Sequence, residues 1–365
     1  MKILEPVAII GAGMMGTAIA AAHMRRGIPV VLYDNSVDTL KTAPHRIAEE
    51  LRLQDCSFHD FLLICSADLP FVSSCPVLIE TITEKIRAKQ KLYETIEAVY
   101  GAADKRLPHP YLFTNTSTIS IAKLAEVLSP KCRKRFCGFH FFHPVRENSL
   151  LEIIPGRETD PATVETASRH AWNIDKRPIT VGDGPGFLVN RILNPYLVSA
   201  QQLLYEGVPM EKIERVATDF GMRMGPFRIM DEIGLDVVLH AGWVMYTAFP
   251  DRVPESLVLI KLVELRRLGR KTGRGFMLYP NSTSWDGDGR PDPELPLQVE
   301  RIDLSEGQIV RRLFFSMYEE ALRCHDDGII SDLADADLAS THALGFPVEK
   351  GGIVQWGAKC SEHEA

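Results

Sequence analysis

The segment that most constrains the fold is a glycine-rich run near the N-terminus. GAGMMG, Gly11 to Gly16, follows the apolar run PVAII and precedes TAIAAAHMRR, which is rich in small residues. A second apolar run, PVVLYD, comes shortly after Gly27. A strand, a glycine turn, a helix and a second strand in this order form one parallel βαβ unit. The chain is therefore predicted to begin with an α/β fold.

The same glycines predict a dinucleotide site. Gly11 suits the tight turn, Gly13 lets the backbone approach a pyrophosphate, and Gly16 allows the helix to pack closely on the strand. A glycine loop alone is a weak signal, because many such loops only make a turn. Asp34, at the end of the next strand, strengthens it, since its carboxylate can bind ribose hydroxyls and repel a 2'-phosphate. NAD is the expected cofactor, bound here by Gly11, Ala12, Gly13, Met14, Met15, Gly16 and Asp34.

Short apolar runs and helical segments alternate through the first half of the chain. The runs lie at 76–79, 111–113, 136–142, 151–154 and 179–181. This alternation predicts a doubly wound, Rossmann-type sheet over residues 1–183.

The second half is predicted to be helical. From Pro185 the apolar residues recur at helical spacing, which predicts an all-helical domain over 184–280. The Pro-, Asp- and Gly-rich stretch after it is interpreted as a linker over 281–304. A weak internal repeat follows over 305–365: LVNRILNPYLVSAQQLLYEG aligns with IVRRLFFSMYEEALRCHDDG, and MGPF recurs loosely as LGFP. The helical unit is thus predicted to be duplicated.

Composition excludes several classes of protein. A formal net charge of -7 argues against nucleic acid as the main partner. We expect no membrane span and no cleavable leader, and so a cytoplasmic location, because the chain has no run of eighteen apolar residues. The seven cysteines show no CxxC spacing, which favours reduced thiols over disulfides or a metal site.

Eight motifs in order resemble the 3-hydroxyacyl-CoA dehydrogenases: VAIIGAGMMG, LIETITE, NTSTISI, GFHFFHPV, LLEIIPG, GPGFLVNRI, MGPF and KTGRGF. Residues 306–352 resemble the duplicated helical domain of the large bacterial fatty-oxidation subunit. The crotonase-like hydratase domain of that subunit is not expected in this chain. The resemblance implies an NAD-dependent dehydrogenase that oxidises a 3-hydroxyacyl thioester.

By this resemblance, His140 is the general base and Glu152 its carboxylate partner. Imidazole can accept a hydroxyl proton near neutral pH. Taken alone, a histidine such as His140 is more often a structural residue whose hydrogen bonds are made inside the sheet. The order of the motifs favours a catalytic role. Glu152 stands in the apolar run LLEII, where an unpaired charge would be costly, so a partner is also expected on physical grounds.

The remaining site residues follow from the same matching. Ser117 and Asn190 are expected to bind the substrate oxygen, although a helix cap and an exposed helical amide are the plainer readings of each. The second repeat has Arg311 in place of Asn190 and lacks an HFFHP-like motif, so one active site per chain is expected. Further cofactor contacts are expected at Glu84, Lys89, Ser117, His143 and Lys271.

Two departures from the family bear on the substrate. His143 replaces an asparagine that contacts the nicotinamide half of the cofactor, and an imidazole lacks the paired functions of an amide. Between Asp34 and Glu80 the chain has a single lysine, Lys41, where relatives carry a longer basic segment that touches the coenzyme A nucleotide. Weaker recognition of that nucleotide would favour a carrier-protein thioester.

Three functions therefore stay open. The first is oxidation of CoA-linked 3-hydroxyacyl groups, and the second is the same chemistry on a short hydroxyacyl group, such as glyceryl, carried by an acyl carrier protein in polyketide extender-unit synthesis. The third is a non-catalytic, crystallin-like NAD-binding protein, which the joint retention of the candidate residues disfavours. The chain is expected to be either a homodimer or a monomer with a pseudo-dimeric helical core.

Overall fold

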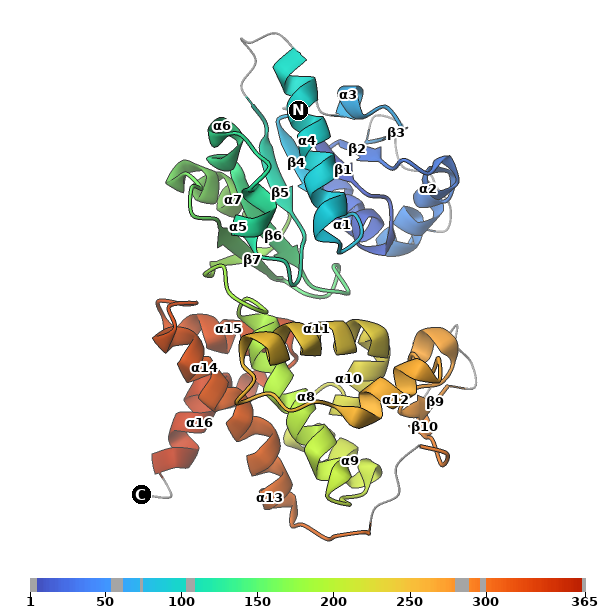
Figure 1. Cartoon of the computed structure of the whole chain (residues 1–365), viewed down its shortest axis with the longest axis vertical. Helices are drawn as coiled ribbons and strands as arrows, with labels where there is room; N and C mark the ends of the chain where they lie inside the picture. The colour runs from blue at the N-terminus through green and yellow to red at the C-terminus, as the bar shows by residue number, and fades with distance from the viewer. Residues whose placement is uncertain are drawn as a thin grey trace. The chain divides into compact units, whose positions relative to one another are not determined.

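The computed structural model describes residues 5–53, 62–72, 75–102, 109–279, 289–295 and 300–362. The chain divides into two compact units, Met1–Gly184 and Pro185–Ala365 (Figure 1). The first unit is built around one sheet, and the second is mainly helical. The predicted fold class, a Rossmann-type sheet followed by an all-helical region, is confirmed.

The sheet of the first unit has eight strands in the order β3-β2-β1-β4-β5-β6-β7-β8. All neighbours are parallel except β6 and β7, which are antiparallel. The order reverses direction at β1, which is the point where ligands bind in open α/β sheets. The strands are β1 (Val7–Ile10), β2 (Val30–Tyr33), β3 (Leu63–Ser66), β4 (Val77–Glu80), β5 (Tyr111–Thr114), β6 (Phe136–Phe141), β7 (Leu150–Pro155) and β8 (Arg177–Thr180).

Burial of both sheet faces explains the composition of these strands. All four residues of β1 and all six of β6 are buried, as expected of strands covered on both faces. The connecting helices are α1 (Met14–Arg25), α2 (Val37–Leu51), α3 (Leu69–Val72), α4 (Ile86–Ala102), α5 (Ile121–Ala125), α6 (Pro130–Arg133) and α7 (Pro161–Asn173).

The edge strand β3 was not among the predicted strands. Its sequence, LICS, is partly exposed at its ends and exposed at its two central residues. Residues 62–65 form the short apolar run LLIC, and a run of this length does not by itself distinguish a strand from part of a helix.

In the second unit, α8 packs against the last helices of the chain. Its closest helical neighbour is α14, and Tyr196 of α8 stacks on Phe314 with 5.5 Å between ring centroids. The helices are α8 (Val189–Tyr205), α9 (Met210–Phe220), α10 (Pro226–Ile233), α11 (Leu235–Ala248), α12 (Leu257–Glu264), α13 (Glu306–Val310), α14 (Ser316–Asp326), α15 (Leu333–Ala343) and α16 (Ile353–Glu362). Shorter elements are η1 (Arg270–Thr272), β9 (Met277–Leu278), β10 (Arg290–Pro291), the π-helical η2 (Arg311–Phe315) and η3 (Val348–Lys350).

One capping arrangement occurs twice in this unit. The fifth residue of α9, Glu214, accepts hydrogen bonds from the N–H groups of the second and third residues of α10, at 2.8 and 3.4 Å. The fifth residue of α15, Asp337, does the same for α16, at 2.7 and 3.3 Å. Gly225 and Gly352 directly precede the capped helices, and a Cβ on either would lie within 3.0 Å of the capping carboxylate.

The two matching capping arrangements support an internal repeat, but they change part of the predicted alignment between its two copies. The predicted match of MGPF with LGFP is wrong at this point, because the structural counterpart of Gly225 is Gly352 rather than Gly345. The physical reason is that the glycine must lie beside the capping carboxylate, and the loop before α16 is longer than the loop before α10.

Part of the stretch interpreted as a linker is anchored. β10 pairs with β9, and Asp292 is buried with its carboxylate bound by Arg274 at 2.6 Å and Arg267 at 3.2 Å. The charged residues of this stretch suggested a solvent-exposed segment, but the charge of Asp292 is instead neutralised by ion pairs with Arg267 and Arg274. Residues 280–288 and 296–299 of that stretch lie outside the described residues.

Helices in the described part of the chain are too short or too polar to span a bilayer.

Candidate active site

The glycine turn after β1 has the geometry that a dinucleotide loop requires. Gly11 has φ +109°, and a Cβ there would lie 2.9 Å from the Thr81 backbone. A Cβ on Gly16 would overlap the carbonyl oxygen of Gly11, so α1 can approach β1 only with glycine at this position. A Cβ on Gly13, by contrast, would meet nothing within 4 Å among the described residues, which leaves backbone open at the start of α1. No side chain caps α1, so its N-terminus suits an anion.

Asp34 lies beside this turn at the end of β2. One carboxylate oxygen accepts a hydrogen bond from the Ala12 N–H at 2.9 Å, and the other accepts one from the Ser36 N–H at 2.8 Å. Each oxygen keeps a further lone pair that can accept from a ribose hydroxyl. Met14 is largely exposed and Met15 half-buried at the first turn of α1. Carboxylate, open glycine backbone and uncapped helix together fit an adenine dinucleotide.

His140 and Glu152 face each other across the only antiparallel pair in the described sheet. The register of β6 and β7 places these two residues directly opposite. Both are buried, and Nδ1 of His140 lies 2.8 Å from a carboxylate oxygen of Glu152. A carboxylate at Nδ1 fixes the proton there and leaves Nε2 to act as the base.

Nε2 of His140 points to the loop after β5. It lies 3.0 Å from the hydroxyl oxygen of Ser117. The predicted residues Glu152, His140 and Ser117 are therefore brought together in one hydrogen-bonded series. A hydroxyl group that contacts both Ser117 and Nε2 would be within proton-transfer distance of the base.

Glu84 holds the loop that carries Ser117. One oxygen of its carboxylate accepts hydrogen bonds from the Ser117 N–H at 2.8 Å, the Thr118 N–H at 3.0 Å and the Thr116 hydroxyl at 2.6 Å. Burial raises the pKa of Glu84, but the Lys89 ammonium and these hydrogen bonds outweigh it and hold the pKa below its usual value. Glu84 is therefore ionised at neutral pH, and its charge orders the loop.

Behind Glu84 lies a buried ion pair. Lys89 is fully buried, with its ammonium 2.7 Å from Glu80 and 3.4 Å from Glu84. The other oxygen of Glu80 accepts hydrogen bonds from the Tyr93 hydroxyl at 2.6 Å and the Thr114 hydroxyl at 2.7 Å. The structure thus connects Lys89 to the Ser117 loop through Glu84. Glu80 was not predicted; its only signal was an acidic residue at the end of an apolar strand.

The segment between β6 and β7 carries His143. Its side chain is exposed, and its carbonyl accepts a hydrogen bond from the Asn148 amide at 2.8 Å. Lys176 is buried and donates to the carbonyl oxygens of Val145 and Asn148, the latter at 2.6 Å. Burial, and to a lesser extent the positive charge of Arg25, lower the pKa of Lys176 to about 8. Lys176 was also missed by the sequence interpretation, although it positions the segment next to the candidate base.

Two predicted residues belong to the second unit. Asn190 is the second residue of α8 and is half-buried. Lys271 lies in η1 and forms an ion pair with Asp236. Arg311, the counterpart of Asn190 in the predicted repeat, lies over the ring of Phe315 at 4.8 Å. No group of three or more metal-ligating side chains occurs in the described ranges.

Comparison with known proteins agrees with both units. Residues 6–184 match the family model for the NAD-binding domain of 3-hydroxyacyl-CoA dehydrogenase, and residues 186–279 match that for its C-terminal domain. The chain is 32% identical over 97% of its length to the fatty acid oxidation complex subunit alpha of Pseudomonas savastanoi pv. phaseolicola. The match covers 50% of that protein, so this chain spans about half the length of such curated relatives.

Two solved structures extend the comparison. The (S)-3-hydroxybutyryl-CoA dehydrogenase PaaH1 from Ralstonia eutropha is 32% identical, with a TM-score of 0.68 over 76% of this chain and 100% of that one. The 3-hydroxybutyryl-CoA dehydrogenase from Escherichia coli K12 shares the fold, with a TM-score of 0.77 and 24% identity over 98% of this chain and 92% of that one. The chain belongs to the 3-hydroxyacyl-CoA dehydrogenase family, whose members are NAD-dependent oxidoreductases.

Proposed function

We propose that the protein oxidises a CoA-linked 3-hydroxyacyl thioester to the 3-oxoacyl thioester with NAD, and that His140 is the general base. The observation that carries the proposal is the series Glu152, His140 and Ser117, with Nε2 directed at a hydroxyl. The names of the Pseudomonas and Ralstonia relatives, a fatty acid oxidation complex subunit and a 3-hydroxybutyryl-CoA dehydrogenase, support a CoA thioester as the substrate.

In this mechanism the Ser117 hydroxyl and Nε2 of His140 hold the substrate C3 hydroxyl between them. Nε2 takes the hydroxyl proton while the hydrogen on C3 leaves with its electron pair, and the C3–O bond becomes a carbonyl. Bound NAD supplies the acceptor for that hydride. The imidazolium that forms is stabilised by the Glu152 carboxylate at 2.8 Å. Asn190 is proposed to orient the substrate oxygen.

The loop around Ser117 contributes by position. Glu84 fixes the Ser117 backbone, so the hydroxyl oxygen stays 3.0 Å from Nε2 before substrate arrives. Preorganised groups avoid the cost of ordering during the reaction. This argues against a non-catalytic, crystallin-like role, because a purely structural protein gains nothing from a buried base aimed at a hydroxyl.

We expect His140→Gln and Glu152→Gln to lower kcat with 3-hydroxybutyryl-CoA by about 100- to 10,000-fold, the range for loss of a general base. NADH absorbance would follow turnover, and titration of intrinsic fluorescence would follow NAD binding, which both variants should keep. His325→Gln, a half-exposed histidine on α14, serves as the matched control and should turn over normally.

A His140→Gln enzyme with near-native turnover would remove this residue from the mechanism. If the wild-type enzyme does not oxidise CoA thioesters but oxidises the same hydroxyacyl group on an acyl carrier protein, the proposed reaction is supported. The substrate is then a carrier-protein thioester and not a CoA thioester. Lack of turnover on both carriers would overturn the proposed function.

A further inference from the structure

The proposed substrate residue Asn190 lies at the start of α8, where the backbone is strained. Gly186 and Phe187, just before the helix, both have a positive φ, +74° and +50°. A bulky residue such as Phe187 rarely adopts this conformation, so the contacts around it must hold it in place. The N-cap residue, Leu188, has no polar side chain that could cap the helix. The first turn of α8 therefore needs another anchor.

Arg191, the residue after Asn190, provides a buried anchor. Its side chain is 2% exposed, and its Nε lies 2.7 Å from a carboxylate oxygen of Glu320 on α14. Its Nη2 binds Asp327, directly after α14, and its guanidinium carbon lies 4.8 Å from the centre of the Phe249 ring. An ion pair between α8 and α14 is thus made one residue away from Asn190.

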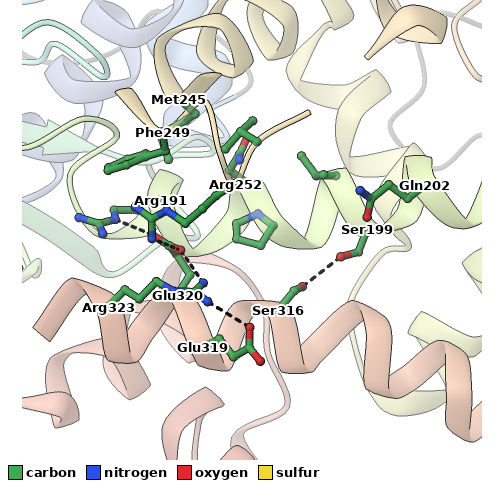
Figure 2. A pocket seen from close by; sticks show the side chains of 14 residues that line it. Arg191, Ser199, Gln202, Met245, Phe249, Arg252, Ser316, Glu319, Glu320 and Arg323 are labelled. Atoms are coloured by element: carbon green, nitrogen blue, oxygen red, sulfur yellow. Dashed lines mark hydrogen bonds and ion pairs between the residues drawn. The ribbon is translucent and has the colours of Figure 1, made fainter. Parts of the chain in front are cut away.

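Three guanidinium groups hold Glu320 in one position, beside a cavity of about 280 Å³ (Figure 2). One of its oxygens binds Arg191, and the other accepts hydrogen bonds from Arg323 at 3.1 Å and Arg252 at 3.3 Å. The Glu320 side chain is 7% exposed, so solvent screens these charges little. The carboxylate therefore binds Arg191 from a fixed place.

The other carboxylates near these arginines are poor substitutes for Glu320. Asp327, which also binds Arg191, is 50% exposed, and Glu319 is 57% exposed. Exposed ion pairs contribute little, because water and salt screen them. Without the charge of Glu320, buried Arg191 would lose its buried partner and would be repelled by the two neighbouring guanidinium groups. A shift of Arg191 would move the first turn of α8.

We propose that Glu320 is a positioning residue for the dehydrogenase reaction: through Arg191 it fixes the first turn of α8 and thereby the Asn190 amide. A displaced amide would lose its alignment with the substrate oxygen, although the base His140 would be unchanged. This inference rests on the proposed function, in which Asn190 orients that oxygen, and adds a residue of α14 to it.

A double-mutant cycle with 3-hydroxybutyryl-CoA and NAD tests the proposal. Glu320→Gln keeps the shape and one oxygen of the side chain but removes its charge, and we expect it to lower kcat/KM for the thioester by about tenfold. In an Asn190→Ala background the same substitution should change kcat/KM by less than about twofold, because the group that it positions is already absent. The Kd of NAD, measured by fluorescence titration, should stay at the wild-type value, since the glycine turn and Asp34 belong to the first unit.

Arg215→Gln is the matched control. The ion pair of Arg215 with Glu306, at 3.0 Å, joins α9 to α13 and involves neither α8 nor α14. This variant should keep the wild-type kcat/KM, and thermal unfolding checks that every variant folds. If Glu320→Gln unfolds, Asp327→Asn takes its place in the cycle, because it removes the other carboxylate on Arg191 from a half-exposed position. Its loss should be about three- to fivefold and should likewise disappear with Asn190→Ala.

Each other result has a defined meaning. An equal loss in both backgrounds means that Glu320 only stabilises the helical unit, and it overturns this proposal while the proposed function stands. An unchanged kcat/KM in the wild-type background overturns it as well. If Asn190→Ala alone turns over like the wild-type protein, the orienting role of Asn190 fails and this inference with it, whereas the role of His140 stands. If the wild-type protein oxidises only the carrier-protein thioester, the same cycle is measured with that substrate; if it oxidises neither thioester, the proposed function and this inference both fail.

Discussion

Single residues in this protein serve two structural partners at once, and Asp34 is an example. Its carboxylate fixes the glycine turn through Ala12 and starts the next segment through Ser36. The negative charge is thereby held at the place where a ribose would bind. We therefore propose that discrimination between NAD and NADP depends on the same side chain that orders the loop.

We expect NAD to bind at least about tenfold more tightly than NADP, because the 2'-phosphate would meet a carboxylate of like charge. Asp34→Asn should weaken NAD binding and bring the dissociation constants of NAD and NADP closer together, because the amide lacks the negative charge. Fluorescence titration measures both constants. Asp38→Asn, which removes an exposed aspartate nearby on α2, should leave the ratio unchanged. Equal affinities in the wild-type protein would contradict the assignment of Asp34.

Sequence motifs identified the candidate catalytic residues better than the residues that hold them in place. His140, Glu152 and Ser117 stand in recognisable motifs, and the structure brings them within hydrogen-bond distance. Glu80 and Lys176 have no motif of their own. Their function depends on which loop each side chain reaches after folding, and sequence spacing does not encode that contact.

At the scale of elements, the capping of α10 by Glu214 has an energetic cost. Burial raises the pKa of Glu214 to about 7, although hydrogen bonds from Phe227 and Arg228 oppose the shift. A raised pKa in the folded state means that folding favours the protonated carboxyl. The stability from this group is complete below the unfolded value of 4.5 and is lost as the pH rises through about 7.

We therefore expect Glu214→Gln to change the pH dependence of stability rather than stability at every pH. Its Tm should be near that of the wild-type protein at pH 5 and a few degrees higher at pH 8, where the wild-type helix pair contains an ionised buried group. Glu211→Gln, an exposed change on the same helix, is the control. A Tm difference that stays constant between pH 5 and pH 8 would contradict the argument.

Element prediction failed where local sequence was ambiguous. β3 is a four-residue edge strand with exposed central residues. Asp292 stands in a stretch rich in Pro, Asp and Gly, a composition typical of solvent-exposed segments. Asp292 is nevertheless buried because Arg267 and Arg274 neutralise it. Such pairing joins residues that are 18 and 25 positions apart, which is beyond any local pattern.

On the scale of the whole molecule, the last helices cover the apolar face of α8. Phe314 of η2 is fully buried and stacks on Phe220 at 3.9 Å as well as on Tyr196. A chain with one helical repeat would expose this face or pair it with a second copy. In this chain, the helices after residue 304 provide an internal partner instead.

We expect the full chain not to use α8 for self-association. A chain ended after Leu304 keeps β10 and the ion pairs of Asp292 but loses the cover of α8, so it should self-associate. Multi-angle light scattering at several protein concentrations measures this. A shortened chain that stays a soluble, stable monomer would contradict the internal pseudo-dimer.

In the proposed mechanism, catalytic competence depends on the antiparallel pairing of β6 and β7. His140 and Glu152 meet because the register places them opposite each other. Since neighbouring residues of a strand face opposite sides of the sheet, a slip of one residue would send the carboxylate away from the imidazole. By the proposed mechanism, a chain with that error is expected to be inactive rather than altered in specificity. Turnover per molecule can therefore serve as a quality test of refolded protein, counting only the chains in which β6 and β7 have paired in register.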